Sequence, residues 1–337
     1  MTELKVACAG AGYFSTFHYE AWARIENTCV VGSMAKEHVS PACQLLPGYS
    51  DLDVMLQETN PDILDIITPP VTHANFINKA LEHNINTITC QKPFCTTLEE
   101  AQKIVADCQE AKTRLVIHEN FRFQPWFRCI KQAIDEGLVG DLHQIVFRLR
   151  TGDGQGPDAY LDRQPYFQTM PRFLIHETGI HYIDTFRYLM GEPTAVYADL
   201  RTMNPAIKGE DAGYFIFDFD RDKRALFDGN RCLDHCADNQ RTTLGECLVE
   251  GNKGSLTLYG DGSVHHRPFG HSDSKVLLAA QIWSGFAGDC VFNFQQHVVD
   301  ALKGTTKLEN SGQEYLRNLA VESALYLSAQ KRMKIDI

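Results

Sequence analysis

Short apolar runs alternate with amphipathic stretches over the first third of the chain. This alternation is typical of repeated strand–helix–strand units, which build a parallel sheet. The apolar runs predict six strands, the number found in a complete dinucleotide-binding fold. The expected strands are 4–9, 29–34, one beginning at 50, 63–68, 85–89 and 114–118, and the expected helices are 13–25, about 41–46, 52–58, 72–83 and 98–111.

The pattern changes after a helix expected at 127–136, which Gly137 closes. Longer alternating runs then indicate a large, mostly antiparallel sheet with one covered face. These runs are 143–150, 195–201, 213–219 and 223–228, and helices are expected over 173–190 and from about 313 to 331. We therefore predict an α/β protein of two domains. Residues 1–122 form a Rossmann-type, doubly wound parallel sheet, and residues 123–337 form an α/β domain with a large open sheet.

Charge and cysteine content narrow the class of partner. A net charge of -11 argues against nucleic acid or an anionic membrane, because either would be repelled. We see neither a bilayer-spanning apolar run nor a secretory leader before the first strand. The 11 cysteines are an odd number scattered along the chain, which is typical of free thiols in a reducing compartment. We expect a cytoplasmic protein that acts on a small neutral molecule.

One cluster of residues raises the question of a metal site. Cys232, His235 and Cys236 lie close together, but they supply only three candidate ligands and have no second pair at zinc-finger spacing. We predict no metal here.

A glycine turn follows the first predicted strand. Gly10-x-Gly12-x-x-Ser15 stands between an apolar strand and a helix. The first glycine permits a tight turn, the second lets backbone N–H groups approach a pyrophosphate, and the helix N-terminus adds partial positive charge. This context predicts bound NAD or NADP, with Tyr13 and Phe14 of the same turn among its contacts.

The end of the second predicted strand bears on the choice between the two dinucleotides. An NAD-specific site normally carries an acidic residue there for the ribose 2′-hydroxyl. This chain has Ala35 and Lys36 instead, so a 2′-phosphate is not repelled and Lys36 can pair with it. Lys36 can equally be a solvated surface charge, and we keep both NAD and NADP as candidates.

Three further segments combine polar residues with turn signals: Asp65-Ile66-Ile67-Thr68-Pro69-Pro70-x-Thr72-His73, Cys90-Gln91-Lys92-Pro93 and Glu177-Thr178-Gly179-Ile180-His181-Tyr182-Ile183-Asp184. They are similar to segments of the glucose–fructose oxidoreductase and inositol dehydrogenase family, Gfo/Idh/MocA. The resemblance extends in order over nearly the whole chain, including Asn120-Phe121-Arg122 and Gly209-Glu210-Asp211.

The resemblance implies a Rossmann domain, a C-terminal domain whose open sheet often mediates oligomerisation, and a site at their junction. It also implies a dimer or tetramer of identical chains. Lys92 and His181 correspond to the family's catalytic pair. Gln91 stands where the family has glutamate, and Glu177 stands where it usually has aspartate. Thr68, Pro69, His73, Gln91 and Lys92 are the implied cofactor contacts after the glycine turn.

The chemistry of these residue types suits hydride transfer. Oxidation of an alcohol needs a base for the hydroxyl proton, and histidine titrates near neutral pH. Lys92 can polarise the oxygen or share the proton. Glu177 precedes His181 by four residues on one predicted helical face, so its carboxylate can orient the imidazole. We predict Lys92, His181 and Glu177 as catalytic residues.

Polar side chains near these segments are candidates for binding substrate hydroxyls, although each can also be an ordinary surface or core residue. They are Asn120, Arg122, Tyr160, Arg163, Arg172 and His176, together with His181.

The leading hypothesis is an NAD(P)-dependent dehydrogenase or reductase of an aldose, ketose or cyclitol. A pentose such as D-apiose, oxidised to its lactone, is one candidate substrate. The resemblance leaves two alternatives: a glycoside hydrolase that uses NAD transiently, and a non-catalytic regulator that binds a dinucleotide. The presence of both Lys92 and His181 argues against the regulator.

Overall fold

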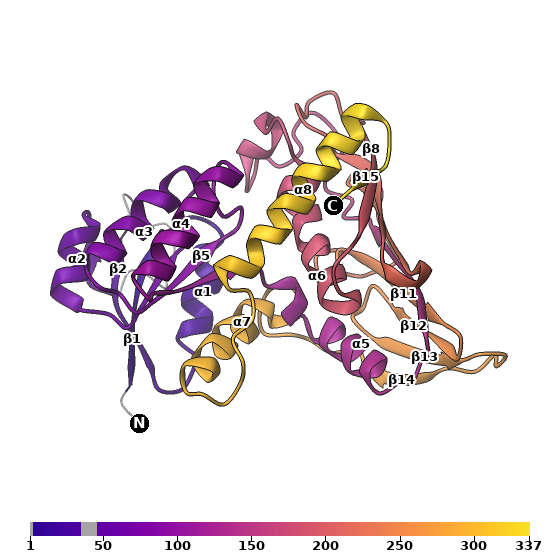
Figure 1. Ribbon diagram of the computed structural model, residues 1–337, viewed down its shortest axis with the longest axis horizontal. Coiled ribbons are helices and arrows are strands. Elements are labelled where there is room, and N and C mark those ends of the chain that lie inside the picture. The colour runs from indigo at the N-terminus through magenta and orange to yellow at the C-terminus, as the bar shows by residue number, and fades with distance from the viewer. Residues whose placement is uncertain (1–2, 35–45) are drawn as a thin grey trace. The chain divides into compact units, whose positions relative to one another are not determined.

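The computed structural model describes residues 3–34 and 46–337. The chain divides into two compact units, shown in Figure 1. The first unit comprises Met1–Asn120 and Val291–Leu319, and the second comprises Phe121–Cys290 and Ala320–Ile337. The predicted border at residue 122 lies close to the first observed one. Residues 291–319, however, group with the first unit and not with the second as predicted.

The returning segment begins within helix α7 (Phe286–Leu302), which the hydrophobic pattern did not reveal. Val299 of this helix is fully buried in the same core cluster as Val6, Trp22 and Ile63. Such a contact joins residues almost 300 positions apart in the chain, so local periodicity carries no signal for it.

The first unit contains the predicted parallel sheet of six strands. Its strand order is β3-β2-β1-β4-β5-β6, and each neighbouring pair is parallel. In such a sheet the connections reverse direction between β1 and β4, and ligands bind beyond the carboxyl ends of the strands at that point. The elements are β1 (Leu4–Ala9), β2 (Thr28–Met34), β3 (Gly48–Tyr49), β4 (Ile63–Ile66), β5 (Thr87–Gln91), β6 (Arg114–His118), α1 (Ser15–Trp22), α2 (Leu52–Thr59), α3 (His73–Glu82) and α4 (Leu98–Glu110).

Several element boundaries in this unit differ from those predicted. The strand predicted to begin at residue 50 is β3, which ends at Tyr49, and the strand predicted over 63–68 ends at Ile66. The first helix is shorter than 13–25, because residues 12–14 form the turn that leads into α1. The fifth strand ends at Gln91 instead of residue 89, which places Lys92 directly after the sheet. The helix predicted around 41–46 lies outside the described residues except for its last position, which is not helical.

The second unit contains a sheet of nine strands in the order β14-β13-β12-β11-β7-β10-β9-β8-β15. Only the β7–β10 pair is parallel, so the predicted mostly antiparallel sheet is confirmed. The elements are β7 (Leu142–Leu149), β8 (Ala195–Arg201), β9 (Ala212–Asp218), β10 (Arg224–Asn230), β11 (Gly245–Gly251), β12 (Gly254–Leu258), β13 (Val264–Pro268), β14 (Lys275–Leu278), β15 (Ile335–Asp336), α5 (Pro125–Asp135), α6 (Ile180–Met190) and α8 (Gly312–Lys331), whose last twelve residues belong to this unit.

One face of the nine-stranded sheet is covered, and α5 and α6 lie on the same side of it in Figure 1. Side chains that alternate toward this side are fully buried, and their aromatic rings pack together. The ring of Tyr182 on α6 lies 4.1 Å from that of Phe147 and 5.1 Å from that of Phe227, which in turn lies 4.7 Å from Phe215. This aromatic core fixes α6 against the sheet.

The helix predicted over 173–190 is interrupted at its start. Leu174–Gly179 form a π-helical turn, and the regular α-helix α6 begins only at Ile180. Glu210 supports this turn, because its backbone oxygen accepts the N–H of Leu174 at 2.8 Å and its side chain accepts that of Ile175 at 3.2 Å. Turns of this type are frequent at functional sites.

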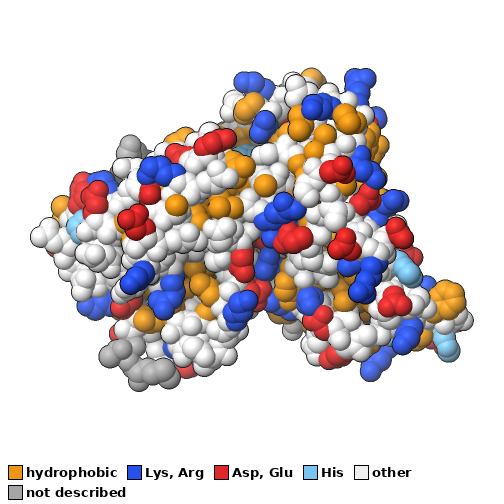
Figure 2. Space-filling view, viewed as in Figure 1, with side chains coloured by type: hydrophobic (Ala, Val, Ile, Leu, Met, Phe, Trp, Pro, Cys, Tyr) orange, Lys and Arg blue, Asp and Glu red, His pale blue; other side chains and the backbone are white. Residues whose placement is uncertain are grey.

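Surface charge is mixed on the visible face of the molecule. Figure 2 shows acidic and basic side chains interspersed, without a large area of one sign. Within the described residues, no helix combines the length and the apolar character that crossing a membrane requires.

Candidate functional site

The glycine turn in the first unit is shaped by the neighbouring strand. Gly10 has a φ of +127°, and an added Cβ there would lie 2.9 Å from both the carbonyl carbon and the oxygen of Ile67. Its N–H donates to the Met34 oxygen at 2.8 Å. Any side chain at this position would strain the backbone and collide with Ile67, directly after β4.

Gly12 is different, because the described residues leave the space beside it open. Apart from its own chain neighbours, none of them has an atom within 4 Å of an added Cβ. Helix α1 begins three residues later without a side-chain cap and without an acidic residue in its first turn. The partial positive charge of its N-terminus is therefore not compensated locally. A small residue, empty space and a helix N-terminus together fit a dinucleotide pyrophosphate.

Of the other cofactor contacts predicted around this turn, the structure describes two and leaves two outside the described residues. Tyr13 is 40% exposed, and the ring of Phe14 lies edge-on to that of His18. Ala35 and Lys36, which bear on the choice between NAD and NADP, lie outside the described residues.

A buried carboxylate lies beneath the turn. Asp65 of β4 is fully buried and accepts hydrogen bonds from His18 Nδ1 at 2.8 Å, Trp22 Nε1 at 2.8 Å and Thr89 Oγ1 at 2.7 Å. Burial alone would raise the pKa of Asp65, but the hydrogen bonds that the carboxylate receives, from His18 and Trp22 among others, favour its ionised form, and the pKa is lowered. Asp65 therefore joins α1, β4 and β5 around one negative charge.

The predicted cofactor residues Gln91 and Lys92 are connected to this carboxylate through His18. Gln91 Nε2 lies 2.8 Å from His18 Nε2, and Gln91 Oε1 accepts the backbone N–H of Lys92 at 2.9 Å. Gln91 is only 7% exposed. Its side chain is directed into the unit, where it holds the backbone at Lys92.

The Thr68-Pro69-Pro70 turn lies at the end of β4 and is held by its own side chains. Thr72 Oγ1 lies 2.7 Å from Thr68 Oγ1 and 2.8 Å from the Pro69 oxygen. His73 is fully buried, with Nε2 2.7 Å from the Thr68 oxygen and Nδ1 2.8 Å from the Phe94 oxygen. Burial lowers the pKa of His73 despite these carbonyls. The ring links the turn to the chain just after Lys92.

Two neighbouring strands end with polar residues at the same edge of the parallel sheet. Gln91 of β5 is in register with His118 of β6, so Lys92 and Glu119 both follow these strand ends. Glu119 is fully buried, and Asn120 is 2% exposed. The Tyr315 hydroxyl donates to Glu119 Oε2 at 3.5 Å, and Asn310 Nδ2 donates to its backbone oxygen at 2.6 Å. Sequence analysis missed Glu119, although its position directly after a buried strand was a usable signal.

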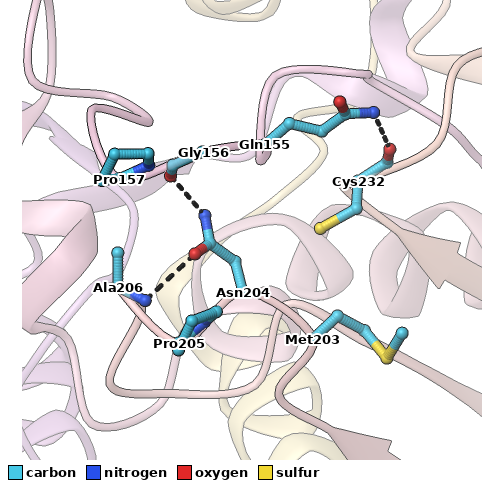
Figure 3. A pocket seen from close by; sticks show the side chains of 8 residues that line it. All are labelled: Gln155, Gly156, Pro157, Met203, Asn204, Pro205, Ala206 and Cys232. Atoms are coloured by element: carbon cyan, nitrogen blue, oxygen red, sulfur yellow. Dashed lines mark hydrogen bonds between the residues drawn. The ribbon is translucent and has the colours of Figure 1, made fainter.

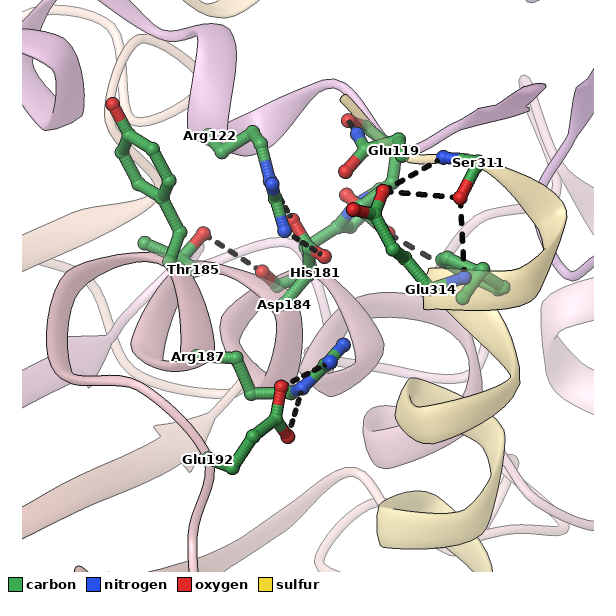
Figure 4. A network of polar contacts seen from close by, with 12 residues as sticks. Glu119, Arg122, His181, Asp184, Thr185, Arg187, Glu192, Ser311 and Glu314 are labelled. Carbon is green, nitrogen blue, oxygen red and sulfur yellow. Dashed lines mark hydrogen bonds and ion pairs between the residues drawn. The ribbon is translucent and has the colours of Figure 1, made fainter. Parts of the chain in front are cut away.

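In the second unit, His181 lies in the first turn of α6. Its side chain is 6% exposed, and its ring stacks on Phe121 with centroids 3.9 Å apart and planes 6° from parallel. Three residues further along, Asp184 receives two hydrogen bonds of 2.7 Å from Arg122, as Figure 4 shows. Such two-point Arg–carboxylate pairs have well-defined geometry. The predicted substrate residue Arg122 therefore anchors the helix that carries His181.

Glu177 lies in the π-helical turn and His181 in the first turn of α6, so the single regular α-helix predicted to carry both is interrupted between them. Glu177 also contributes to the electrostatics of a neighbouring cluster. Its negative charge raises the pKa of Tyr166, after the larger effect of burial, and it is one of the charges that raise the pKa of Arg231.

Arg231 is the centre of that cluster and was missed by sequence analysis. It donates to Thr178 Oγ1 at 2.7 Å, Tyr160 Oη at 2.8 Å and Asp153 Oδ2 at 3.2 Å, and Arg163 donates to the same Asp153 oxygen at 2.5 Å. Burial is the largest single influence and opposes the charge of Arg231, but Asp153, Tyr160 and Glu177 together outweigh burial and raise the pKa of Arg231. The predicted substrate residues Tyr160 and Arg163 thus belong to this cluster. The cluster also holds the π-helical turn, through the hydrogen bond from Arg231 to Thr178.

Two further predicted substrate residues contact the C-terminal helix. His176 Nδ1 lies 2.6 Å from Glu322 Oε1, and the Tyr326 hydroxyl lies 3.2 Å from the His176 backbone nitrogen. The guanidinium of Arg172 lies 4.3 Å above the Tyr326 ring. Arg172 is exposed and His176 is half-buried.

A concave pocket of about 600 Å³ lies elsewhere in the second unit, and none of the predicted site residues lines it. Figure 3 shows that the amide of Asn204, at its centre, donates to the Gly156 oxygen and accepts from the Ala206 N–H. Nearby, His235 Nδ1 contacts the Arg150 oxygen at 2.7 Å. Among the described residues, no group of three or more His, Cys, Asp or Glu side chains is arranged to hold a metal ion.

Comparison with protein families gives two matches in sequence order. Residues 4–119 match the family described as an oxidoreductase family with an NAD-binding Rossmann fold, and residues 127–257 match the GFO/IDH/MocA C-terminal domain. The matched regions coincide with the six-stranded sheet and with much of the nine-stranded sheet.

Individual proteins are similar over the whole length. A D-apiose dehydrogenase from Paraburkholderia graminis is 29% identical, covering 99% of this chain and 89% of its own, and one from Rhizobium rhizogenes is 28% identical, covering 100% and 98%. The solved structure of an Agrobacterium radiobacter oxidoreductase in complex with NAD+, L-tartaric acid and magnesium shares the fold, with a TM-score of 0.87, 24% identity and coverage of 99% and 98%. With both of its domains matched, the chain belongs to the Gfo/Idh/MocA family of NAD-binding oxidoreductases.

Proposed function

We propose that this protein is an NAD(P)-dependent dehydrogenase that oxidises a hydroxyl-bearing carbon of a sugar or polyol. The observation that carries the proposal is the position of Lys92, directly after β5 at the carboxyl edge of a dinucleotide-binding sheet. The two D-apiose dehydrogenases that resemble the chain over its whole length support a pentose substrate oxidised to a lactone.

The bound dinucleotide supplies the hydride acceptor. The chain's own residues handle the proton and the oxygen of the substrate hydroxyl. We assign His181 as the base, oriented by its stacking on Phe121 and by the Arg122–Asp184 pair that anchors its helix. We assign Lys92 to polarise the oxygen, and Glu177, four residues before His181, to orient the imidazole.

The remaining site residues form two groups, those held by other side chains and those proposed to contact the substrate. Arg122, Tyr160 and Arg163 have polar atoms bound to Asp184, Arg231 and Asp153, so they shape the substrate side indirectly. The exposed Arg172 and the half-buried His176 are proposed to contact substrate hydroxyls, together with Asn120. In the first unit, Thr68, Pro69 and Gly12 contact the dinucleotide, with His73 holding the turn.

We further propose that identical chains associate through the uncovered face of the nine-stranded sheet. A row of half-buried apolar side chains crosses five adjacent strands there: Tyr197, Ile216, Leu226, Val146 and Leu248. A continuous apolar row on an antiparallel sheet is unusual on a surface that stays in water. Because β7 and β10 lie near the middle of the sheet, a two-fold axis there would pair the row with itself.

The substrate class is tested by a panel of aldoses, ketoses and cyclitols, assayed with NAD and NADP in parallel for formation of reduced nicotinamide. We expect turnover with a pentose of the D-apiose type and a lactone as product. Release of a glycoside's leaving group without net formation of reduced cofactor would support hydrolysis in place of oxidation and would contradict the proposal.

The two glycines of the turn make a matched pair. Gly10→Ala should lower the free energy of unfolding by roughly 1–3 kcal/mol, because its φ is positive and its Cβ meets Ile67. Gly12→Ala should leave stability within about 0.5 kcal/mol of the original protein but weaken dinucleotide binding, because only the ligand needs that space. Urea unfolding and calorimetric titration with NAD measure the two effects. Unchanged NAD affinity in Gly12→Ala would argue that no pyrophosphate lies there.

His181→Ala tests the assignment of the base. We expect kcat to fall by roughly 10²–10⁴-fold, with NAD affinity and unfolding nearly unchanged, because the dinucleotide is bound by the first unit. His143→Ala, at an exposed position on β7, is the matched control. The assignment fails if the His181→Ala protein turns over substrate at the rate of the control.

Leu226→Arg tests the proposed association. A charge at the middle of the apolar row should shift the protein to a monomer in sedimentation equilibrium, because an unpaired buried charge is costly at an interface. Ile282→Arg places the same charge at a fully exposed position and should leave the assembly unchanged. A Leu226→Arg protein that keeps the assembly of the original would rule out this face.

A further inference from the structure

Gln91 is the position at which this chain departs from the glutamate of its family, and its side chain lies between two groups of the first unit. One end of the amide faces the imidazole of His18 at 2.8 Å, and the other accepts the backbone N–H of Lys92 at 2.9 Å. His18 is fully buried, and Gln91 is 7% exposed.

The hydrogen atoms in this arrangement can be assigned by elimination. A backbone N–H only donates, so the Gln91 atom that receives the Lys92 N–H is the amide oxygen, and the NH2 group faces His18. An amide NH2 also only donates, so His18 Nε2 must be the acceptor and carries no hydrogen. The amide orientation thus follows from the network and does not depend on distinguishing oxygen from nitrogen.

The other ring nitrogen completes the assignment. His18 Nδ1 lies 2.8 Å from Asp65 Oδ2, so a neutral ring carries its hydrogen on Nδ1 and donates it to the carboxylate. Trp22 and Thr89 also donate to Asp65, which holds this carboxyl in its ionised form. The other titratable ring against His18 is that of His118, whose centroid lies 4.2 Å away.

We propose that His18 is a positioning residue for Lys92. A neutral imidazole with its hydrogen on Nδ1 donates to Asp65 and accepts from the Gln91 amide. These two hydrogen bonds keep the amide in place, and the amide oxygen in turn holds the backbone N–H of Lys92. The NH2 group at position 91 needs an acceptor, and His18 Nε2 can be one only without a hydrogen of its own. A glutamate there would set a carboxylate oxygen against the bare Nε2, and only a second proton on the ring would relieve the repulsion.

The charge state is tested by nitrogen NMR of histidine-labelled protein at neutral pH. In the original protein, the resonances of His18, assigned by their loss in His18→Gln, should show one protonated and one unprotonated nitrogen, with the hydrogen on Nδ1. In Gln91→Glu, both nitrogens should be protonated. A hydrogen on Nε2 in the original protein, or a neutral His18 in Gln91→Glu, overturns the proposal.

The link to Lys92 is tested with Gln91→Leu, which keeps the volume but removes the acceptor. The Lys92 amide should exchange with solvent about tenfold faster or more, because its hydrogen bond is lost. If the proposed function holds, kcat should fall roughly ten- to a hundredfold through misplacement of Lys92, while NAD affinity changes by less than about threefold. Gln57→Leu, at an exposed position on α2, is the control.

The effect on kcat rests on the proposed function, but the NMR and amide-exchange measurements do not. A protein without sugar oxidation that still shows the predicted His18 hydrogen and the faster Lys92 exchange would contradict the function and leave the positioning role supported. Unchanged Lys92 exchange in Gln91→Leu would overturn the positioning role, whatever the substrate.

Discussion

The dinucleotide-binding unit depends on the hydrogen bonds that stabilise the buried carboxylate of Asp65. An uncompensated charge in such a place costs several kcal/mol, so each of its donors is needed. Those donors come from α1 through His18 and Trp22, from β5 through Thr89, and from α7 through Gln295 at 3.4 Å. Asp65 therefore orients the helix that follows the glycine turn and the strand that leads to Lys92.

The second unit uses ion pairs in the same way. Arg122 anchors Asp184 on α6, and Arg231 connects Asp153 to Thr178 in the π-helical turn. Removing one partner would leave the other charge buried and unpaired, at a cost of about 3–5 kcal/mol. These pairs hold Thr178 and Asp184, on either side of His181, with the precision that the proposed proton transfer requires.

The sequence predicts what local pattern encodes. The six parallel strands follow from short apolar runs, and the need for glycine at position 10 follows from a turn between strand and helix. Long-range contacts were not predictable: Val299 joins the first core from the far end of the chain, and Arg231 reaches Asp153 and Thr178 across 53 residues or more. The π-helical turn was missed because Glu210, which supports it, is distant in sequence and has no periodic signal.

The proposed function depends on direct transfer of hydride from a sugar carbon to the bound dinucleotide. A substrate labelled with deuterium at its reacting carbon tests this step, followed by mass spectrometry of the recovered nicotinamide dinucleotide. We expect one deuterium in each molecule of reduced dinucleotide and a slower rate with the labelled sugar. Reduced dinucleotide that contains no deuterium would contradict it.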